Sequence, residues 1–392
     1  MRIFFSAGEP SGDQHAAHLI QELRARHDQL EAEGFGGPEM REQGCTLLFE
    51  LTQLAVMGLL QTLPLLAKFR RLVIRAERFF DESPPDAVVL IDFPGFNWWI
   101  ARAAKKRGIP VYYYLPPQLW AWAPWRIRRI RKWVDRVICT LPFEFDWYHS
   151  RGVSATWVGH PFFDEVASKQ LDQSLLSELN SDSQEQRLIA ILPGSRNHEI
   201  ERNFPVMLEV IRRVSDELPG IRWVVGNYGA EHTATCQSLQ TESGIDADLT
   251  YFVDRTSEVI EAADCCLMVS GSISLELLAR RTPGIVLYRI GRIPRLLARV
   301  LVNCRYITLT NMIAERELMP EFLSAGNPLR DVQKISRHLI NWCRDPSSLA
   351  QRRSEMSELA DRAAITGATA RVAELLLTEV AGAAESDASK AA

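Results

Sequence analysis

The chain has 392 residues, a length that favours two domains over a single core. Hydrophobic residues make up 46% and charged residues 24% of the chain, which excludes a disordered protein. The formal net charge of −4 argues against a general nucleic-acid binder, so we expect no nucleic-acid partner.

Neither the thiols nor the apolar runs indicate an exported or membrane-spanning protein. The seven cysteines show no CxxC or Cys/His ligand spacing, which predicts reduced thiols in the cytoplasm. The N-terminus enters a strand at Arg2 without a signal-peptide pattern, and no apolar stretch approaches the ~20 residues that span a bilayer. We therefore expect a cytoplasmic protein that can still lie on a membrane surface.

Short apolar runs alternate with amphipathic stretches, a pattern that predicts an α/β fold with two doubly wound parallel sheets. The predicted strands of the first half are Ile3–Ser6, Ala87–Ile91, Val111–Tyr114 and Arg136–Thr140. Those of the second half are Leu188–Leu192, Ile221–Val225, Thr250–Val253, Cys265–Val269 and Ile285–Tyr288. Ligands of such sheets bind at the carboxyl ends of the strands, so the loops there are the places to search.

Composition also suggests where the domains divide. The polar segment 167–186 is interpreted as the crossover between an N-terminal domain over residues 1–170 and a C-terminal domain over residues 187–345. Residues 346–380 are expected to form helices that pack back on the N-terminal domain. The small, polar residues 381–392 are expected to be a disordered tail.

The loop after the first predicted strand is rich in small residues. Its candidate ligand contacts are Gly8, Glu9, Ser11 and Gly12, because glycine lets a ligand approach the backbone and helix N-termini carry free N–H groups. The alternative is a tight turn in which Ser11 or Asp13 caps the following helix.

Asp92 follows the buried strand Ala87–Ile91 and is held by a Pro-Gly turn, a placement suited to a general base. Asn97 lies in the same loop and is a candidate contact in the cleft. The alternative for Asp92 is a cap of the next helix. Further on, Gln118 and Trp120 lie in a loop of proline and tryptophan that indicates a cleft wall, or else ordinary core.

Two kinds of surface residue suggest contact with a membrane. The apolar candidates are Val56, Met57, Leu59, Leu60 and Leu63. The basic candidates are Arg128 and Arg129, in a segment that interleaves cations with aromatic residues and isoleucine. Either group alone fits a core or a solvated helix face, but together they fit a surface that meets anionic lipid headgroups.

The second half carries two loops suited to a diphosphate. Ser195 and Arg196 follow one strand, where backbone N–H groups and a guanidinium can hold phosphate oxygens. A second loop brings Gly271, Ser272 and Ser274 to a helix N-terminus. Glu276 in that helix could accept hydrogen bonds from ribose hydroxyls, or could serve only as a carboxylate that favours the helix dipole.

Two further features are weaker. His160, near the end of the first domain, is a second-choice acid or base, since a lone histidine is more often structural. The Asp246-Ala247-Asp248 sequence lacks a supporting His or Glu, so we expect no metal site and no cofactor.

Read together, these loops resemble those of the lipid-A-disaccharide synthase family. The matching segments, in the order of the family, are Gly8–Asp13, Leu54–Gly58, Asp92–Asn97, Gln118–Trp122, Leu141–Glu144, Gly159–Pro161, Leu192–Arg196, Ser270–Ser272 with Glu276, and Asn311 with Arg316–Leu318. One such motif would be weak, but the ordered set is specific and reaches to about residue 325.

The resemblance implies an inverting glycosyltransferase of the GT-B fold, with two Rossmann-like domains that face a cleft. It implies that UDP-2,3-diacylglucosamine donates its sugar to 2,3-diacylglucosamine 1-phosphate (lipid X), giving lipid A disaccharide 1-phosphate and UDP at the inner face of the bacterial inner membrane. Asp92 would be the base, with His160 or Asp13 as the fallback. Asn311 and Arg316 would line the donor side, and no metal would be required.

Two positions depart from the family pattern. Gly95 stands where many members carry a second acidic residue, and Glu315 stands where a small residue is common.

Two alternatives remain open, and the sequence leaves the oligomeric state open as well. One is another lipid-linked UDP-GlcNAc-type transferase or an epimerase on the same fold, which would not require acyl chains. The other is a non-catalytic UDP-sugar-binding protein on a membrane surface.

Overall fold

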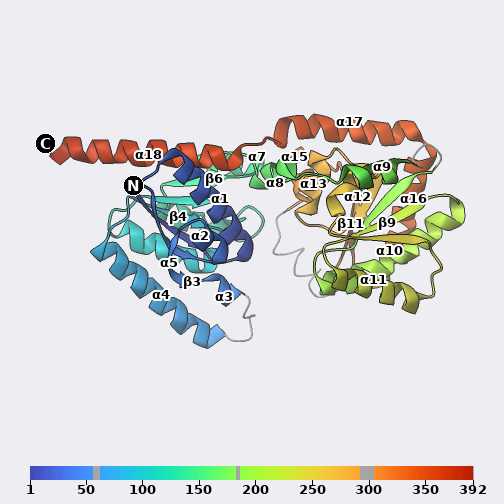
Figure 1. Ribbon diagram of the computed structural model, residues 1–392, viewed down its shortest axis with the longest axis horizontal. Helices are drawn as coiled ribbons and strands as arrows, with labels where there is room; N and C mark the ends of the chain where they lie inside the picture. The colour runs from blue at the N-terminus through green and yellow to red at the C-terminus, as the bar shows by residue number, and fades with distance from the viewer. Residues whose placement is uncertain (56–61, 182–185, 292–303, 392) are drawn as a thin grey trace. The chain divides into compact units, whose positions relative to one another are not determined.

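The computed structural model describes residues 1–55, 62–181, 186–291 and 304–391. The chain divides into two compact units (Figure 1). Unit 1 comprises Met1–Asp164 together with Thr366–Ala392, and unit 2 comprises Glu165–Ile365.

Unit 1 is built on a seven-stranded parallel sheet of order β3-β2-β1-β4-β5-β6-β7. Its strands are β1 Arg2–Ala7, β2 Glu31–Gly36, β3 Thr46–Glu50, β4 Ala87–Ile91, β5 Val111–Tyr114, β6 Arg136–Cys139 and β7 Ala155–Trp157. Its helices are α1 Pro10–Arg26, α2 Pro38–Glu42, α3 Thr52–Ala55, α4 Thr62–Glu82, α5 Pro94–Lys105, the 3-10 turn η2 Pro124–Arg126, α6 Ile127–Trp133, α7 Pro142–His149 and α18 Ala368–Ala391. Helix α8, Pro161–Ser168, contains the boundary between the units.

Unit 2 is built on a six-stranded parallel sheet of order β10-β9-β8-β11-β12-β13. Its strands are β8 Leu188–Leu192, β9 Arg222–Asn227, β10 Leu249–Val253, β11 Cys265–Met268, β12 Gly284–Arg289 and β13 Glu321–Ser324. Its helices are α9 Gln173–Ser181, α10 Asn197–Glu217, α11 Ala230–Ser243, α12 Thr256–Ala262, α13 Ile273–Ala279, α15 Leu309–Ala314, α16 Leu329–Arg344 and α17 Pro346–Ala363.

The structure confirms the predicted fold class of two doubly wound parallel sheets. All nine predicted strands are present, and the bounds of β4, β5 and β8 coincide with the predicted ones. These three strands are buried along their whole length, so their sequences are continuous apolar runs.

Four strands were missed: β2, β3, β7 and β13. In β2 the sequence contains two glutamates and two glycines, which conceal the strand pattern. Gly34 is required there because it has φ +148 and a Cβ at this position would lie 1.9 Å from the Phe5 carbonyl oxygen. The other three strands are short and only partly buried, so their sequences carry a weak signal.

The C-terminal helices are shared between the units. Helix α17 packs on α13 and α16 in unit 2, whereas α18 packs on α1 in unit 1. Helix α18 continues to Ala391, through the segment expected to be a disordered tail, and its alanines have the highest helix propensity of any residue. The segment interpreted as a crossover likewise contains α9.

Helix α18 completes the core of unit 1. Val372, Ala373, Leu376 and Val380 are buried in the same cluster as apolar residues of β1 and β4. Asp164 accepts hydrogen bonds from the backbone N–H groups of Gly367 and Thr369 and so fixes the start of the helix. One face of the first sheet therefore depends on residues that lie about two hundred positions away in sequence from the rest of unit 1.

The structure also bears on the predictions about membrane spans, thiols and membrane-contact residues. No described helix is long and apolar enough to cross a membrane. All seven cysteines are free thiols. The predicted membrane residues Val56, Met57, Leu59 and Leu60 lie outside the described residues, as does the side chain of Leu63.

We predict that Leu376→Ala lowers the free energy of unfolding by roughly 2–5 kcal/mol, because it leaves a cavity beneath α18. The matched control is Thr378→Ala, an exposed position on the same helix, where a change within about 0.5 kcal/mol is expected. Urea denaturation measures both variants. Equal stability of the two variants would contradict a core role for α18.

Candidate active site

The predicted loops lie where the strand order of each sheet reverses. In unit 1 the reversal falls between β1 and β4, and these two strands lead into the Gly8 and Asp92 loops. In unit 2 it falls between β8 and β11, which lead into the Ser195 and Ser270 loops. Doubly wound sheets bind ligands at this point because adjacent loops diverge there and leave a crevice.

Asp92 sits in an unusual backbone conformation at the unit 1 reversal. Asp92 and Phe93 both have φ 44, in the left-handed region that is unfavourable for residues with a side chain. Phe93 is the N-cap of α5, with Pro94 at the first helical position. The strained pair turns the chain from β4 into α5 within two residues.

Asn97 holds this turn in place. Its side-chain amide donates hydrogen bonds to the carbonyl oxygens of Ser6 (3.1 Å), Ile91 (3.2 Å) and Asp92 (2.7 Å). Its oxygen accepts from the Ser6 hydroxyl at 2.7 Å. Because Asn97 is fully buried, it positions Asp92 and does not face solvent as an acceptor contact would. Tyr113 adds a hydroxyl bond to the Asp92 carbonyl at 2.8 Å.

The electrostatic environment of Asp92 suits a base near neutral pH. Burial, followed by the negative charge of Glu9, raises the pKa of Asp92 to about 6. The Phe93 backbone N–H opposes this shift. A carboxylate with this pKa is ionised at pH 7 and still has useful proton affinity.

The loop after β1 meets the Asp92 loop directly. A Cβ at Gly8 would lie 2.1 Å from the Phe93 ring, so this close packing requires glycine. Helix α1 begins at Pro10 with Glu9 as its N-cap. Ser11 is exposed in the first turn of α1, whereas Gly12 is buried.

Asp13 has a different role from the one expected. Its carboxylate accepts hydrogen bonds from the backbone N–H groups of Gly37 (2.7 Å), Glu39 (3.0 Å) and Met40 (3.3 Å). It therefore holds the N-terminus of α2 rather than capping its own helix. With both oxygens engaged and 1% exposure, it has a structural role.

The loop that contains Gln118 and Trp120 is fixed by the buried carboxylate of Glu144. The Trp120 indole N–H donates to Glu144 at 3.0 Å, and burial raises the pKa of Glu144 to about 7. Gln118 is exposed. The matching segment Leu141–Glu144 contained this residue, but its sequence alone does not reveal the indole as its partner.

His160 lies in a desolvated environment. Burial, with a smaller contribution from His15, lowers the pKa of His160 to about 3. Its Nδ1 accepts a hydrogen bond from the Phe162 backbone N–H at 3.2 Å. The ring is therefore neutral at pH 7.

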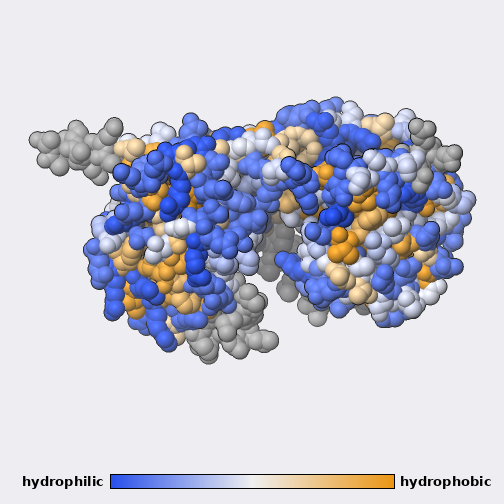
Figure 2. Space-filling model, in the orientation of Figure 1, coloured by the Kyte–Doolittle hydropathy of each residue, from blue (hydrophilic) through white to orange (hydrophobic). Residues whose placement is uncertain are grey.

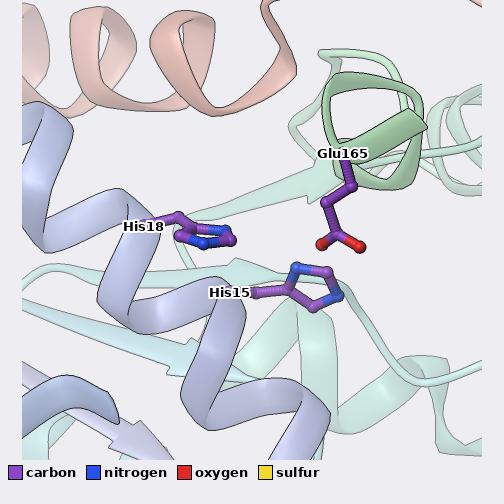
Figure 3. A group of neighbouring side chains, drawn as sticks. All are labelled: His15, His18 and Glu165. Atoms are coloured by element: carbon purple, nitrogen blue, oxygen red, sulfur yellow. The ribbon is translucent and has the colours of Figure 1, made fainter. Parts of the chain in front are cut away.

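His15 and His18 lie on α1, and Glu165 lies on α8 (Figure 3). Their ligand atoms are within 4.8 Å of one another, a grouping that could hold a metal ion. Burial, with a smaller contribution from His18, lowers the pKa of His15 to about 4, so that its ring is neutral. The expectation of no metal remains a prediction.

In unit 2 the two predicted loops form one small pocket. Ser195, Gly271 and Ser272 line it, with Gly194 and Tyr228, and its volume is about 60 Å³. The side chain of Arg196 is 70% exposed and pairs with Glu199 at 3.0 Å, so it is free to turn towards an anion. Backbone N–H groups beside a mobile cation are a suitable environment for a diphosphate.

Two predicted residues, Ser274 and Glu276, are not among the lining residues of this pocket. Ser274 is buried and its hydroxyl donates to the Gly271 carbonyl at 3.0 Å, which fixes the loop. Glu276 pairs with Arg280 at 3.0 Å, and Arg280 also pairs with Glu261. The carboxylate of Glu276 is therefore held in one position.

The Asn311 segment is also organised internally. The Asn311 amide donates to the Met319 carbonyl (2.7 Å) and to Glu321 (2.8 Å), and its oxygen accepts from the N–H groups of Leu318 and Met319. Asn311 is fully buried, so its side chain does not line a donor site. Arg316 is half-exposed and pairs with Glu355 at 3.2 Å. Glu315 has φ 54, in the left-handed region that only glycine adopts without the steric cost of a Cβ.

The polar lining residues Tyr228 and Thr256 were missed from the sequence. Tyr228 and Thr256 follow the carboxyl ends of β9 and β10, so the strand rule could have found them. Tyr228 is half-exposed, and its ring offers a surface on which a base could stack.

Comparison with known proteins agrees with this architecture. A family model described as lipid-A-disaccharide synthetase matches residues 3–365. The lipid-A-disaccharide synthase of Myxococcus xanthus is 35% identical over 377 residues, covering 96% of this chain and 97% of that protein. The synthase of Geobacter sulfurreducens is 30% identical over 376 residues, covering 96% of each.

Two solved structures share the fold at low sequence identity. The UDP-GlcNAc 2-epimerase from Neisseria meningitidis bound to UDP-GlcNAc has a TM-score of 0.61 at 14% identity, covering 96% of this chain and 99% of its own. The calicheamicin glycosyltransferase CalG4 has a TM-score of 0.56 at 14% identity, covering 98% and 99%.

We predict that Asn97→Ala lowers the free energy of unfolding by roughly 1–3 kcal/mol, because it leaves the Ser6 hydroxyl and buried carbonyl groups without partners. Asn341→Ala, at an exposed position of α16, is the matched control and should change stability little. Urea denaturation gives the comparison. Similar stability for the two variants would show that Asn97 does not hold the turn.

Proposed function

The chain belongs to the lipid-A-disaccharide synthetase family, glycosyltransferases of lipid A biosynthesis, and we propose that it joins UDP-2,3-diacylglucosamine to lipid X. The products are lipid A disaccharide 1-phosphate and UDP. Unit 1 binds the acceptor and unit 2 the UDP part of the donor. The observation that carries this assignment is the position of Asp92, whose pKa is about 6, at the strand reversal of unit 1.

In this proposal Asp92 is the general base. The acceptor hydroxyl attacks the anomeric carbon of the donor sugar and forms the new C–O bond, while the bond to UDP breaks and UDP keeps the electron pair. The hydroxyl proton passes to the Asp92 carboxylate. Displacement from the face opposite UDP inverts the configuration. The loop has Gly95 where relatives can carry a second acid, so Asp92 alone supplies the carboxylate between Ile91 and Asn97.

Unit 2 stabilises the departing diphosphate. Ser195 and the backbone at Gly271 and Ser272 donate hydrogen bonds, and Arg196 leaves Glu199 to meet the phosphate charge. Glu276 accepts from the ribose hydroxyls, and Tyr228 stacks on the uracil. Arg316 contributes from the donor side, where Asn311 has a supporting role.

The remaining polar residues of unit 1 bind or position the acceptor. Glu9, Ser11 and Gln118 are accessible for contact with its sugar, whereas Gly8, Gly12 and Trp120 shape the cleft wall. Asp13 is assigned a structural role because of its three hydrogen bonds, and His160 is kept as the alternative base.

We place the enzyme in the cytoplasm, at the inner face of the bacterial inner membrane. Exposed apolar side chains of unit 1, including Leu66 and Trp125, together with Arg128 and Arg129 on α6, support a peripheral contact with anionic lipid.

The first test is UDP release by the purified protein given UDP-2,3-diacylglucosamine and lipid X in detergent with EDTA. We expect turnover that requires lipid X and continues in EDTA. Release of UDP without lipid X would favour a hydrolytic activity instead, whereas conversion of the UDP-sugar without net UDP release would favour an epimerase. UDP binding without turnover would favour a different acceptor or a non-catalytic role.

The second test concerns the base. We expect kcat/KM to rise with pH through about 6, because Asp92 must lose its proton before it can accept one. Asp92→Asn should lower kcat by about 10²–10⁴-fold while UDP affinity is retained. Near-normal turnover of this variant would remove Asp92 from the role. A rising limb near pH 6 that persists in the variant would do the same and would point to a group other than His160, whose pKa is about 3.

A further inference from the structure

A groove of about 870 Å³ lies between α4 and α5 in unit 1. Its volume is within the range of small-ligand sites. The apolar lining comes from both helices and includes Phe69, Val73, Ile74, Trp99 and Ala103. Ile74 and Trp99 are 40% and 54% exposed, so the groove opens to solvent. Figure 2 shows apolar residues gathered on the surface over α4 and α5.

The two helices run side by side in the same direction. At one end, Phe69 of α4 packs against Phe93 and Phe96, with ring centroids 6.1 and 5.3 Å apart. At the other end, Arg107 pairs with Asp81 at 2.6 Å, just beyond α5 and near the end of α4. The groove's lining residues run from 66 to 77 and from 95 to 106, so its two ends are eleven positions apart in each segment. At 1.5 Å per residue its length is about 16 Å.

One end of this groove is at the proposed catalytic loop. Gly95 lines the groove and lies three residues after Asp92. Apart from its chain neighbours and the backbone of its own helix, no heavy atom of the described residues lies within 4 Å of the position that a Cβ of Gly95 would take, so the entrance is open there. A ligand held at Asp92 can therefore extend an apolar group directly into the groove.

Charge on the rim favours an anionic ligand. Arg70, Arg102 and Lys106 line the groove, and none of the three forms an ion pair with another residue in the described part of the chain. The acidic lining residue, Glu77, lies 4.0 Å from Arg107. Arg70 is near the Phe69 end, where the groove opens towards the Asp92 loop. Long basic side chains can line an apolar groove with their stems and keep their charges in water.

We propose that the α4–α5 groove binds one fatty acyl chain of the phosphate-bearing acceptor. This inference rests on the proposed function and adds a binding site to it. The sugar lies at Asp92, the acyl chain passes Gly95 into the groove, and the rim cations meet the negative charge of the acceptor. The length of the groove thereby determines how many methylene groups of the acyl chain contribute to binding.

The test is a series of acceptors that differ only in acyl-chain length, used below the concentration at which they form micelles and without detergent. We expect kcat/KM to fall about fourfold for each methylene removed, because each buried methylene contributes to binding. The decrease in kcat/KM should end at acyl chains that are too short to reach Gly95.

Two variants remove the apolar wall without touching the polar loops. Ile74→Ser and Trp99→Ser should each lower kcat/KM for the longest acceptor by about tenfold and leave the shortest acceptor unaffected. Leu329→Ser is the matched control, since Leu329 is 58% exposed on α16 in unit 2. It should retain the wild-type dependence on chain length.

Several outcomes would overturn the groove assignment. One is a wild-type enzyme that turns over all chain lengths equally, and another is groove variants with an unchanged length dependence. If those variants instead lose binding to vesicles containing an anionic phospholipid while their length dependence stays normal, the surface contacts a membrane rather than a substrate chain. If no acceptor is turned over, the proposed function fails. The groove assignment is then tested separately, by calorimetric measurement of how the affinity for the same acceptors depends on acyl-chain length.

Discussion

The hydrogen bonds of Asn97 are the constraint on which the candidate site of unit 1 depends. A single buried amide joins the end of β1 to the end of β4 and holds two residues in the left-handed region. Such a backbone persists only where the surroundings impose it. Once it is imposed, the Phe93 ring excludes any side chain at Gly8, α5 starts directly after the turn, and the Asp92 carboxylate is brought close to Glu9.

The two units share the same strand topology, but the electrostatic environments at their strand reversals are opposite in character. At the reversal of unit 1, burial and a neighbouring carboxylate raise the proton affinity of Asp92. At the reversal of unit 2, the pocket offers small residues, and an exposed arginine lies beside it. The first environment favours accepting a proton and the second favours accepting negative charge. A displacement reaction that transfers a proton and releases a diphosphate needs both.

Much of the fold could be predicted from the sequence because buried parallel strands are apolar throughout. The strands β4, β5 and β8 show this clearly, whereas β2 does not, since its glycines serve close backbone packing. The loops were also predictable, but not the partners of their polar residues. Asn97, Asp13 and Asn311 all prove to be buried and hydrogen-bonded within the protein. A sequence cannot separate such residues from ligand contacts, because Asn and Asp serve in both roles.

Gly95 belongs both to the Asp92 loop and to the lining of the α4–α5 groove. An acidic side chain there would stand at the entrance of an apolar groove, where its charge would oppose an anionic ligand. Glycine leaves the entrance open, but it also leaves Asp92 without a second carboxylate inside its loop. The proton affinity that a second acid would otherwise confer on Asp92 comes instead from burial and from Glu9 in the neighbouring loop. The raised pKa of Asp92 therefore needs no second acid in its loop, and glycine at position 95 leaves the groove entrance open.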